Sequence, residues 1–112
     1  MKRFSLATAC ATALLLGSAS VAHAETIFVS NEKDNTITVV DGETLKTIDT
    51  IKTARRPRGI VLSPDFKELF VAAGDGDIID VIDTKTLKIT RQLESGPDPE
   101  LMDVDPDGKI IY

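Results

Sequence analysis

The chain has 112 residues, of which 13 are lysine or arginine and 18 are aspartate or glutamate, so its formal net charge is −5. An acidic surface repels nucleic acid and anionic lipid, and we expect neither as a partner. The single cysteine and the single histidine, Cys10 and His23, both lie within the first 24 residues, and the chain has no tryptophan.

The first 24 residues have the three parts of a secretory signal peptide. Met1-Lys2-Arg3 is basic, residues 4–16 are an uncharged apolar run, and Ala22-His23-Ala24 places small residues before a cleavage site between Ala24 and Glu25. The apolar run is shorter than the ~20 residues that a membrane-spanning helix needs. A lipoprotein anchor on Cys10 is a weaker alternative, because most of the apolar run follows this cysteine. We therefore expect export to the periplasm, with no membrane span in the mature chain.

Cleavage would leave residues 25–112 without cysteine or histidine. A disulfide, a thiol nucleophile, a Ser-His-Asp triad, a C-x-x-C-H haem attachment and a His/Cys zinc site all need one of these residues. We therefore expect no catalytic residue, no cofactor and no metal site within the mature residues.

The mature residues read as short β-branched segments with turn residues between them, which is typical of an all-β fold. The turns contain glycine, proline, asparagine and aspartate, as in Gly42-Glu43-Thr44 and Pro64-Asp65. No segment has a convincing helical period. Strands are expected over residues 26–30, 36–41, 45–53, 59–63, 69–73, 78–83, 87–94 and 101–105.

A repeat of 42 residues underlies this pattern. When residues 26–70 are set against the residues 42 positions later, 12 of the 45 pairs are identical, among them Phe28 with Phe70 and Pro57 with Pro99. Four strands in about 42 residues, joined by tight turns, are the content of one β-propeller blade. The sequence therefore predicts an all-β chain of four-stranded antiparallel blades that form an incomplete propeller.

Three segments resemble the YVTN family of β-propeller repeats: Ile27-Phe28-Val29-Ser30-Asn31, Thr36-Ile37-Thr38-Val39-Val40-Asp41 and Ile60-Val61-Leu62-Ser63-Pro64-Asp65. The second copy departs from the pattern at Ala72-Ala73, and Phe66 stands where the family usually has glycine. The exported start together with residues 25–112 also resembles the periplasmic propeller proteins associated with PQQ-dependent alcohol catabolism.

The resemblance implies how the chain divides into blades. Residues 25–55 would be the outer three strands of a first blade, residues 56–97 a complete second blade, and residues 98–112 the start of a third. The first blade would lack its innermost strand, so we interpret the chain as an N-terminal fragment that needs further blades to close the propeller.

Arg55, Arg56 and Arg58 are the best candidates for a binding site. Three guanidinium groups in one loop could hold a carboxylate or a phosphate in forked geometry. The positions 42 residues later carry Pro97, Asp98 and Glu100, so the repeat itself does not require the arginines. The alternative is a solvated loop whose arginines pair with acidic neighbours such as Asp98 and Glu100.

Two acidic turns are candidate cation sites. Residues 103–108, Asp-Val-Asp-Pro-Asp-Gly, match the first half of a calcium-binding loop, and residues 74–77 read Gly-Asp-Gly-Asp. In both cases the repeat aligns the segment with a hairpin turn of the first copy, so a structural turn is the favoured interpretation.

These observations favour a non-catalytic propeller that binds a protein partner or a small ligand, and the resemblance implies a role in support of periplasmic PQQ-dependent alcohol oxidation. One alternative is a propeller enzyme, such as a lactonase-like hydrolase or a quinoprotein or haem oxidoreductase, with its active site in blades beyond Tyr112. The lack of tryptophan disfavours the quinoprotein dehydrogenases. Another alternative is a surface or adhesion repeat array.

Overall fold

A computed structural model describes residues 25–112. The expected signal peptide and Ala24 of its cleavage site lie outside the described residues. Within the described part, no helix is long and apolar enough to cross a membrane. The elements are the strands β1 (Thr26–Asn31), β2 (Thr36–Asp41), β3 (Thr47–Lys52), β4 (Pro57–Leu62), β5 (Glu68–Ala73), β6 (Ile78–Asp83) and β7 (Lys88–Glu94), with one 3₁₀ turn, η1 (Gly74–Gly76), between β5 and β6.

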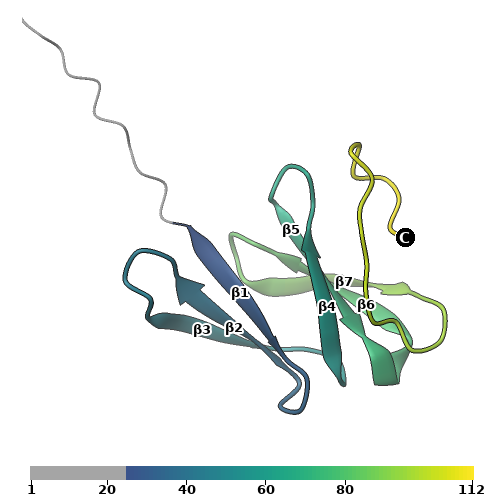
Figure 1. The fold of residues 1–112 in the computed structure, drawn as a ribbon, viewed down its shortest axis with the longest axis horizontal. Coiled ribbons are helices and arrows are strands. Elements are labelled where there is room, and N and C mark those ends of the chain that lie inside the picture. The colour runs from purple at the N-terminus through teal and green to yellow at the C-terminus, as the bar shows by residue number, and fades with distance from the viewer. Residues whose placement is uncertain (1–24) are drawn as a thin grey trace, which may run out of the picture.

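The strands form two antiparallel sheets, one of three strands in the order β1-β2-β3 and one of four in the order β4-β5-β6-β7 (Figure 1). The registers of the two sheets correspond: Phe28 pairs with Val39 in the first sheet, and Phe70 pairs with Val81 in the second. The all-β fold class and the four-stranded antiparallel blade of an incomplete propeller are therefore confirmed.

The turns repeat as faithfully as the strands. Backbone φ is positive at four positions of each copy, and each position recurs 42 residues later: Asn35 and Asp77, Leu45 and Leu87, Arg56 and Asp98, Phe66 and Gly108. L-residues other than asparagine and aspartate rarely adopt this left-handed conformation, because Cβ then approaches the carbonyl oxygen. The chain therefore keeps the same turn geometry even where the residue type is unfavourable.

Alternation along β5 and β6 sends apolar side chains to both faces of the second sheet. One face packs against the first sheet through a buried cluster of Ile37, Val39, Ile51, Leu69, Val71 and Ile82. The opposite face holds Phe70, Ile79 and Val81, against which Met102, Val104 and Ile111 of the C-terminal segment pack. The second sheet thus lies between two apolar layers, as a propeller blade does.

The first sheet has one face that the described residues leave uncovered. Ile27 and Val29 of β1 are 42% and 44% exposed, whereas Leu69 and Val71, at the same positions of the next copy, are 1% and 0% exposed. The first sheet covers Leu69 and Val71, but within residues 25–112 no preceding sheet covers Ile27 and Val29 in the same way.

One predicted strand is absent from the structure, and others have different bounds. Residues 101–105 form no regular strand, so that prediction was wrong: Val104 makes one isolated bridge to Ile111, because the pairing there runs only from Asp103 with Tyr112 to Asp105 with Ile110. The strands expected from Leu45 and Leu87 begin at Thr47 and Lys88 instead, because each leucine has a φ of 57° and belongs to a turn. The strand expected over residues 59–63 runs over Pro57–Leu62.

Candidate functional site

The loop of residues 53–56 joins the two sheets and is held by both of them. The Arg56 amide donates to Asn35 Oδ1 in the β1–β2 turn of the first sheet at 2.8 Å, and the Ala54 amide donates to Asp80 Oδ2 on β6 of the second sheet at 2.7 Å. The Gly74 amide donates to the Arg56 carbonyl at 3.1 Å. The loop that carries Arg55 and Arg56 is therefore fixed rather than free, whereas Arg58, expected in the same loop, lies on β4.

Asp80 is a buried part of this support. Its side chain is fully buried on β6, and Gln92 Nε2 of the neighbouring strand donates to its other oxygen, Oδ1, at 2.7 Å. The position corresponds to Thr38 in the first copy, so the repeat alignment did not indicate the role of this residue. The signal that could have found it is a single charge within the apolar run Ile78-Ile79-Asp80-Val81-Ile82, since a buried carboxylate needs hydrogen-bond donors.

Arg56 lies at the centre of an ion-pair network. Its Nη1 is 2.9 Å from Asp75 Oδ1, its Nη2 is 2.6 Å from Asp98 Oδ1, and its Nε is 3.5 Å from Glu32 Oε1. Burial by itself would lower the pKa of Arg56, but the hydrogen bond to Asp75 and the charges of Asp98, Asp75 and Glu32 outweigh it, so this pKa lies above its ordinary value. The guanidinium stays charged and is already occupied by carboxylates.

Arg58 on β4 makes a second set of pairs. Its Nη1 pairs with Glu100 Oε1, and its Nε is 3.7 Å from the same Glu32 oxygen that faces Arg56. The side chains of Arg56 and Arg58 are 32% and 33% exposed. Glu32, at the start of the β1–β2 turn, therefore lies between two guanidinium groups.

Arg55 differs from the other two arginines. Its side chain is 80% exposed, and Nη2 lies 3.4 Å from Asp75 Oδ2. Most of its guanidinium faces solvent, so Arg55 is the member of the cluster that an external anion can reach without displacing a carboxylate. Together, the three guanidinium groups face four carboxylates, those of Glu32, Asp75, Asp98 and Glu100.

Gly74 provides the space in which Arg56 and Asp98 meet. A Cβ atom at this position would lie 2.7 Å from Asp98 Oδ1 and 3.3 Å from Arg56 Cζ. The turn expected at residues 74–77 is present as η1, whereas the sequence did not indicate that Gly74 packs against the ion pair. Asp75 and Asp77 of the same segment hold Arg56 and the Asp98 amide, respectively.

The acidic segment 103–108 also forms a turn. Asp105 Oδ1 accepts hydrogen bonds from the amides of Lys109 at 2.6 Å and Ile110 at 2.8 Å. Within residues 25–112, no group of three or more histidine, cysteine, aspartate or glutamate side chains is arranged to hold a metal ion.

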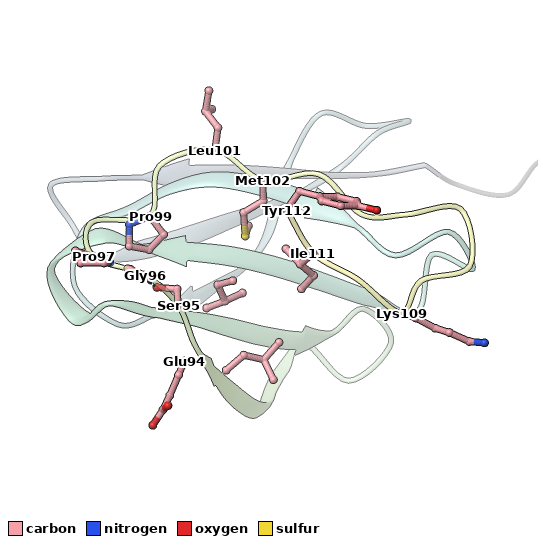
Figure 2. A pocket seen from close by; sticks show the side chains of 12 residues that line it. Glu94, Ser95, Gly96, Pro97, Pro99, Leu101, Met102, Lys109, Ile111 and Tyr112 are labelled. Atoms are coloured by element: carbon pink, nitrogen blue, oxygen red, sulfur yellow. Dashed lines mark hydrogen bonds between the residues drawn. The ribbon is translucent and has the colours of Figure 1, made fainter.

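A pocket lies elsewhere, between the end of β7 and the C-terminal segment, and has a volume of about 510 Å³ (Figure 2). Ile79, Leu93, Met102 and Ile111 form its apolar floor. None of the three arginines lines it. On the equivalent face of the first sheet, Ile37 and Ile51 are covered by Leu69, Val71 and Ile82, so this pocket occupies a blade-packing face rather than a site with its own polar groups.

Comparison with known proteins places the chain in a family. The sequence pattern of the YNCE-like β-propeller matches residues 4–112. The chain belongs to the YNCE-like β-propeller family. No curated protein is significantly similar in sequence to this YNCE-like propeller chain.

Solved structures with similar folds include two enzymes. The YNCE-like chain is similar to hydrazine synthase of Kuenenia stuttgartiensis, with 28% identity and a TM-score of 0.74 over 78% of this chain and 25% of that one. It is similar to the dihydro-heme d1 dehydrogenase NirN, with 22% identity and a TM-score of 0.69 over 77% of this chain and 18% of that one. A protein of unknown function from Desulfotomaculum acetoxidans DSM 771 has 21% identity and a TM-score of 0.67 over 78% of this chain and 30% of that one. The chain thus spans less than a third of each of these proteins.

Proposed function

We propose that this YNCE-like chain belongs to an exported, non-catalytic propeller that binds an anionic group of a protein partner or a small ligand at Arg55. The observation that carries the proposal is the exposed guanidinium of Arg55 on a loop that both sheets hold in place. A rigid loop loses little conformational entropy when a ligand binds, which favours affinity. A carboxylate is the best match in chemistry, because a guanidinium binds it through two parallel hydrogen bonds.

The resemblance of the exported start and the repeats to propeller proteins of PQQ-dependent alcohol catabolism supports a periplasmic location and an accessory role in that oxidation. Residues 25–112 carry no cysteine, histidine or tryptophan, which agrees with binding rather than catalysis in this part of the protein.

A second candidate function is that these blades form part of an enzyme. The similarity to hydrazine synthase and to NirN favours it, since both of those proteins are named as enzymes. In that case the reacting groups would belong to the rest of the protein, and the two sheets described here would serve as framework.

The binding proposal is tested with the full-length mature protein and two separate probes, succinate and inorganic phosphate. Each probe is titrated while the backbone amide signals of residues 53–58 are followed by NMR. We expect a saturable shift with succinate, and its loss in Arg55→Ala. Arg91→Ala is the matched control, because Arg91 pairs with Glu68 inside the second sheet, and it should keep the response. A shift that does not saturate, or equal loss in both variants, would contradict the proposal.

The accessory role is tested separately by deleting the gene in the native host and measuring growth on an alcohol as sole carbon source. We expect slower growth, restored by the wild-type gene, and a mature protein that begins at Glu25 when it is isolated from the periplasm. Unchanged growth would exclude the accessory role, whereas lactone hydrolysis or bound haem in the purified full-length protein would favour the enzyme.

A further inference from the structure

Two ion pairs join residues that are one repeat apart. Arg56 pairs with Asp98, and Arg58 pairs with Glu100, so each arginine contacts the residue at its own position in the next copy. We infer that these four residues form a charge-selective latch. A copy that carries Arg56 and Arg58 accepts as its neighbour only a copy with acidic residues at the equivalent positions, here Asp98 and Glu100. The inference does not depend on ligand binding at Arg55.

The geometry explains why equivalent positions meet. A propeller places the same residue of successive copies at the same radius, so residues 42 positions apart become neighbours across a blade boundary. The backbones touch here: the Gly59 amide of β4 donates to the Glu100 carbonyl at 2.8 Å. A repeat copied without change would place like charges side by side at this point, and like charges repel.

The sequence departs from the repeat at this boundary in a correlated way. Arg56 and Arg58 become Asp98 and Glu100, whereas Pro57 between them is retained as Pro99. The charge is therefore reversed at both flanking positions. The proline between them, which restricts the backbone conformation, is the same in the two copies.

A third position changes together with them. Glu32, which faces both arginines at 3.5 and 3.7 Å, corresponds to Gly74 in the next copy, and Gly74 faces Asp98. A glutamate at position 74 would add a carboxylate beside Asp98, and even a Cβ atom would lie 2.7 Å from the Asp98 carboxylate. A glutamate is thus present at position 32, which faces the basic residues Arg56 and Arg58. It is absent at the equivalent position 74, which faces the acidic Asp98.

The backbone also permits an exchange of the two charges. Arg56 and Asp98 have similar left-handed conformations, with φ of 61° and 50°. Aspartate tolerates this conformation better than most residues, and arginine already occupies it at position 56. An exchange of the two side chains therefore changes the charge pattern without a new demand on the backbone.

The test is a charge-reversal cycle in the full-length mature protein, with Arg56→Asp, Asp98→Arg and the double variant. The reporter is hydrogen exchange of the Gly59 amide, which donates across the boundary. Each single reversal should raise its exchange rate by about tenfold. The double variant should exchange more slowly than Arg56→Asp alone but faster than wild type, because Glu32 and Asp75 still face position 56. A second cycle with Arg58→Glu and Glu100→Arg keeps the test valid if a variant of the first cycle does not fold.

The control is the pair of Glu68 and Arg91, which lies within the second sheet and does not cross a boundary. Its single reversals should leave the exchange rate of the Gly59 amide unchanged. Single reversals at the latch that do not change this rate, or double variants that exchange as fast as Arg56→Asp or Arg58→Glu alone, would overturn the inference and leave the pairs as ordinary solvated contacts.

Discussion

At the scale of single residues, the left-handed turn positions show where the chain accepts strain in order to keep its repeat. Phe66 has a φ of 59° and a side chain that is largely exposed, whereas the same position of the next copy is Gly108, with a φ of 70°. The phenylalanine gains little from packing, so its cost is mainly that of a bulky residue in a conformation that suits glycine.

Phe66→Gly should therefore stabilise the protein by roughly 0.5–1 kcal/mol. The left-handed conformation costs an ordinary residue roughly 1–2 kcal/mol, and the greater freedom of glycine in the unfolded chain offsets part of the gain. The midpoint of urea unfolding measures the effect, and Gly108→Ala should shift it in the opposite direction. A lower midpoint for F66G would mean that the ring contributes packing that its exposure does not indicate.

At the scale of elements, an aspartate at the equivalent position of each copy, Asp41 and Asp83, holds the turn that follows β2 and β6. Backbone and side-chain hydrogen bonds from Thr44 lower the pKa of Asp41, and those from Thr86 lower the pKa of Asp83. In each turn the charged carboxylate accepts the threonine amide at 2.7 Å. These carboxylates stabilise the folded state only while they are ionised.

Because the folded pKa of each carboxyl lies below its unfolded value, this stabilisation is complete above a pH of about 4 and is lost as the pH falls through the folded pKa. The free energy of unfolding, measured by urea titration between about pH 2 and pH 6, should therefore decrease toward acid. Asp41→Asn together with Asp83→Asn should flatten this slope, and each single variant should flatten it in part. An unchanged slope in the double variant would show that other carboxylates control acid unfolding.

The elements also show how far the sequence could be interpreted. Alternation and turn residues were sufficient to place the seven strands and the register of the repeat, because these are local properties. The turn conformation of Leu45 was not predictable from a residue type that favours neither turns nor a positive φ. The sequence alignment had already placed Asp98 and Glu100 at the positions of Arg56 and Arg58. The parts played by Glu32, Gly74 and Asp80 depend on how one sheet is set against the next, which no single copy specifies.

At the scale of the whole molecule, the contact between the second sheet and residues 98–112 depends on a close approach of two backbones. Any side chain at Gly59 would collide with the Glu100 carbonyl oxygen, which accepts the Gly59 amide. Gly59→Ala should therefore separate residues 98–112 from the second sheet, seen as faster protease cleavage within that segment. Gly96→Ala is the matched control, since among residues 25–112 no heavy atom beyond the two chain neighbours lies within 4 Å of a Cβ at that position. Equal cleavage rates in the two variants would contradict the expectation.

The opposite charges one repeat apart also bear on how such a gene can change in length. Tandem repeats gain and lose units readily when misaligned copies recombine. A duplication of residues 56–97 would insert a unit that begins with its own Arg56 and Arg58 directly after the original one, so that arginine would face arginine at the new boundary. The protein with the extra unit would be less stable than the original because of this repulsion. The opposite charges at this boundary therefore disfavour a duplication of residues 56–97.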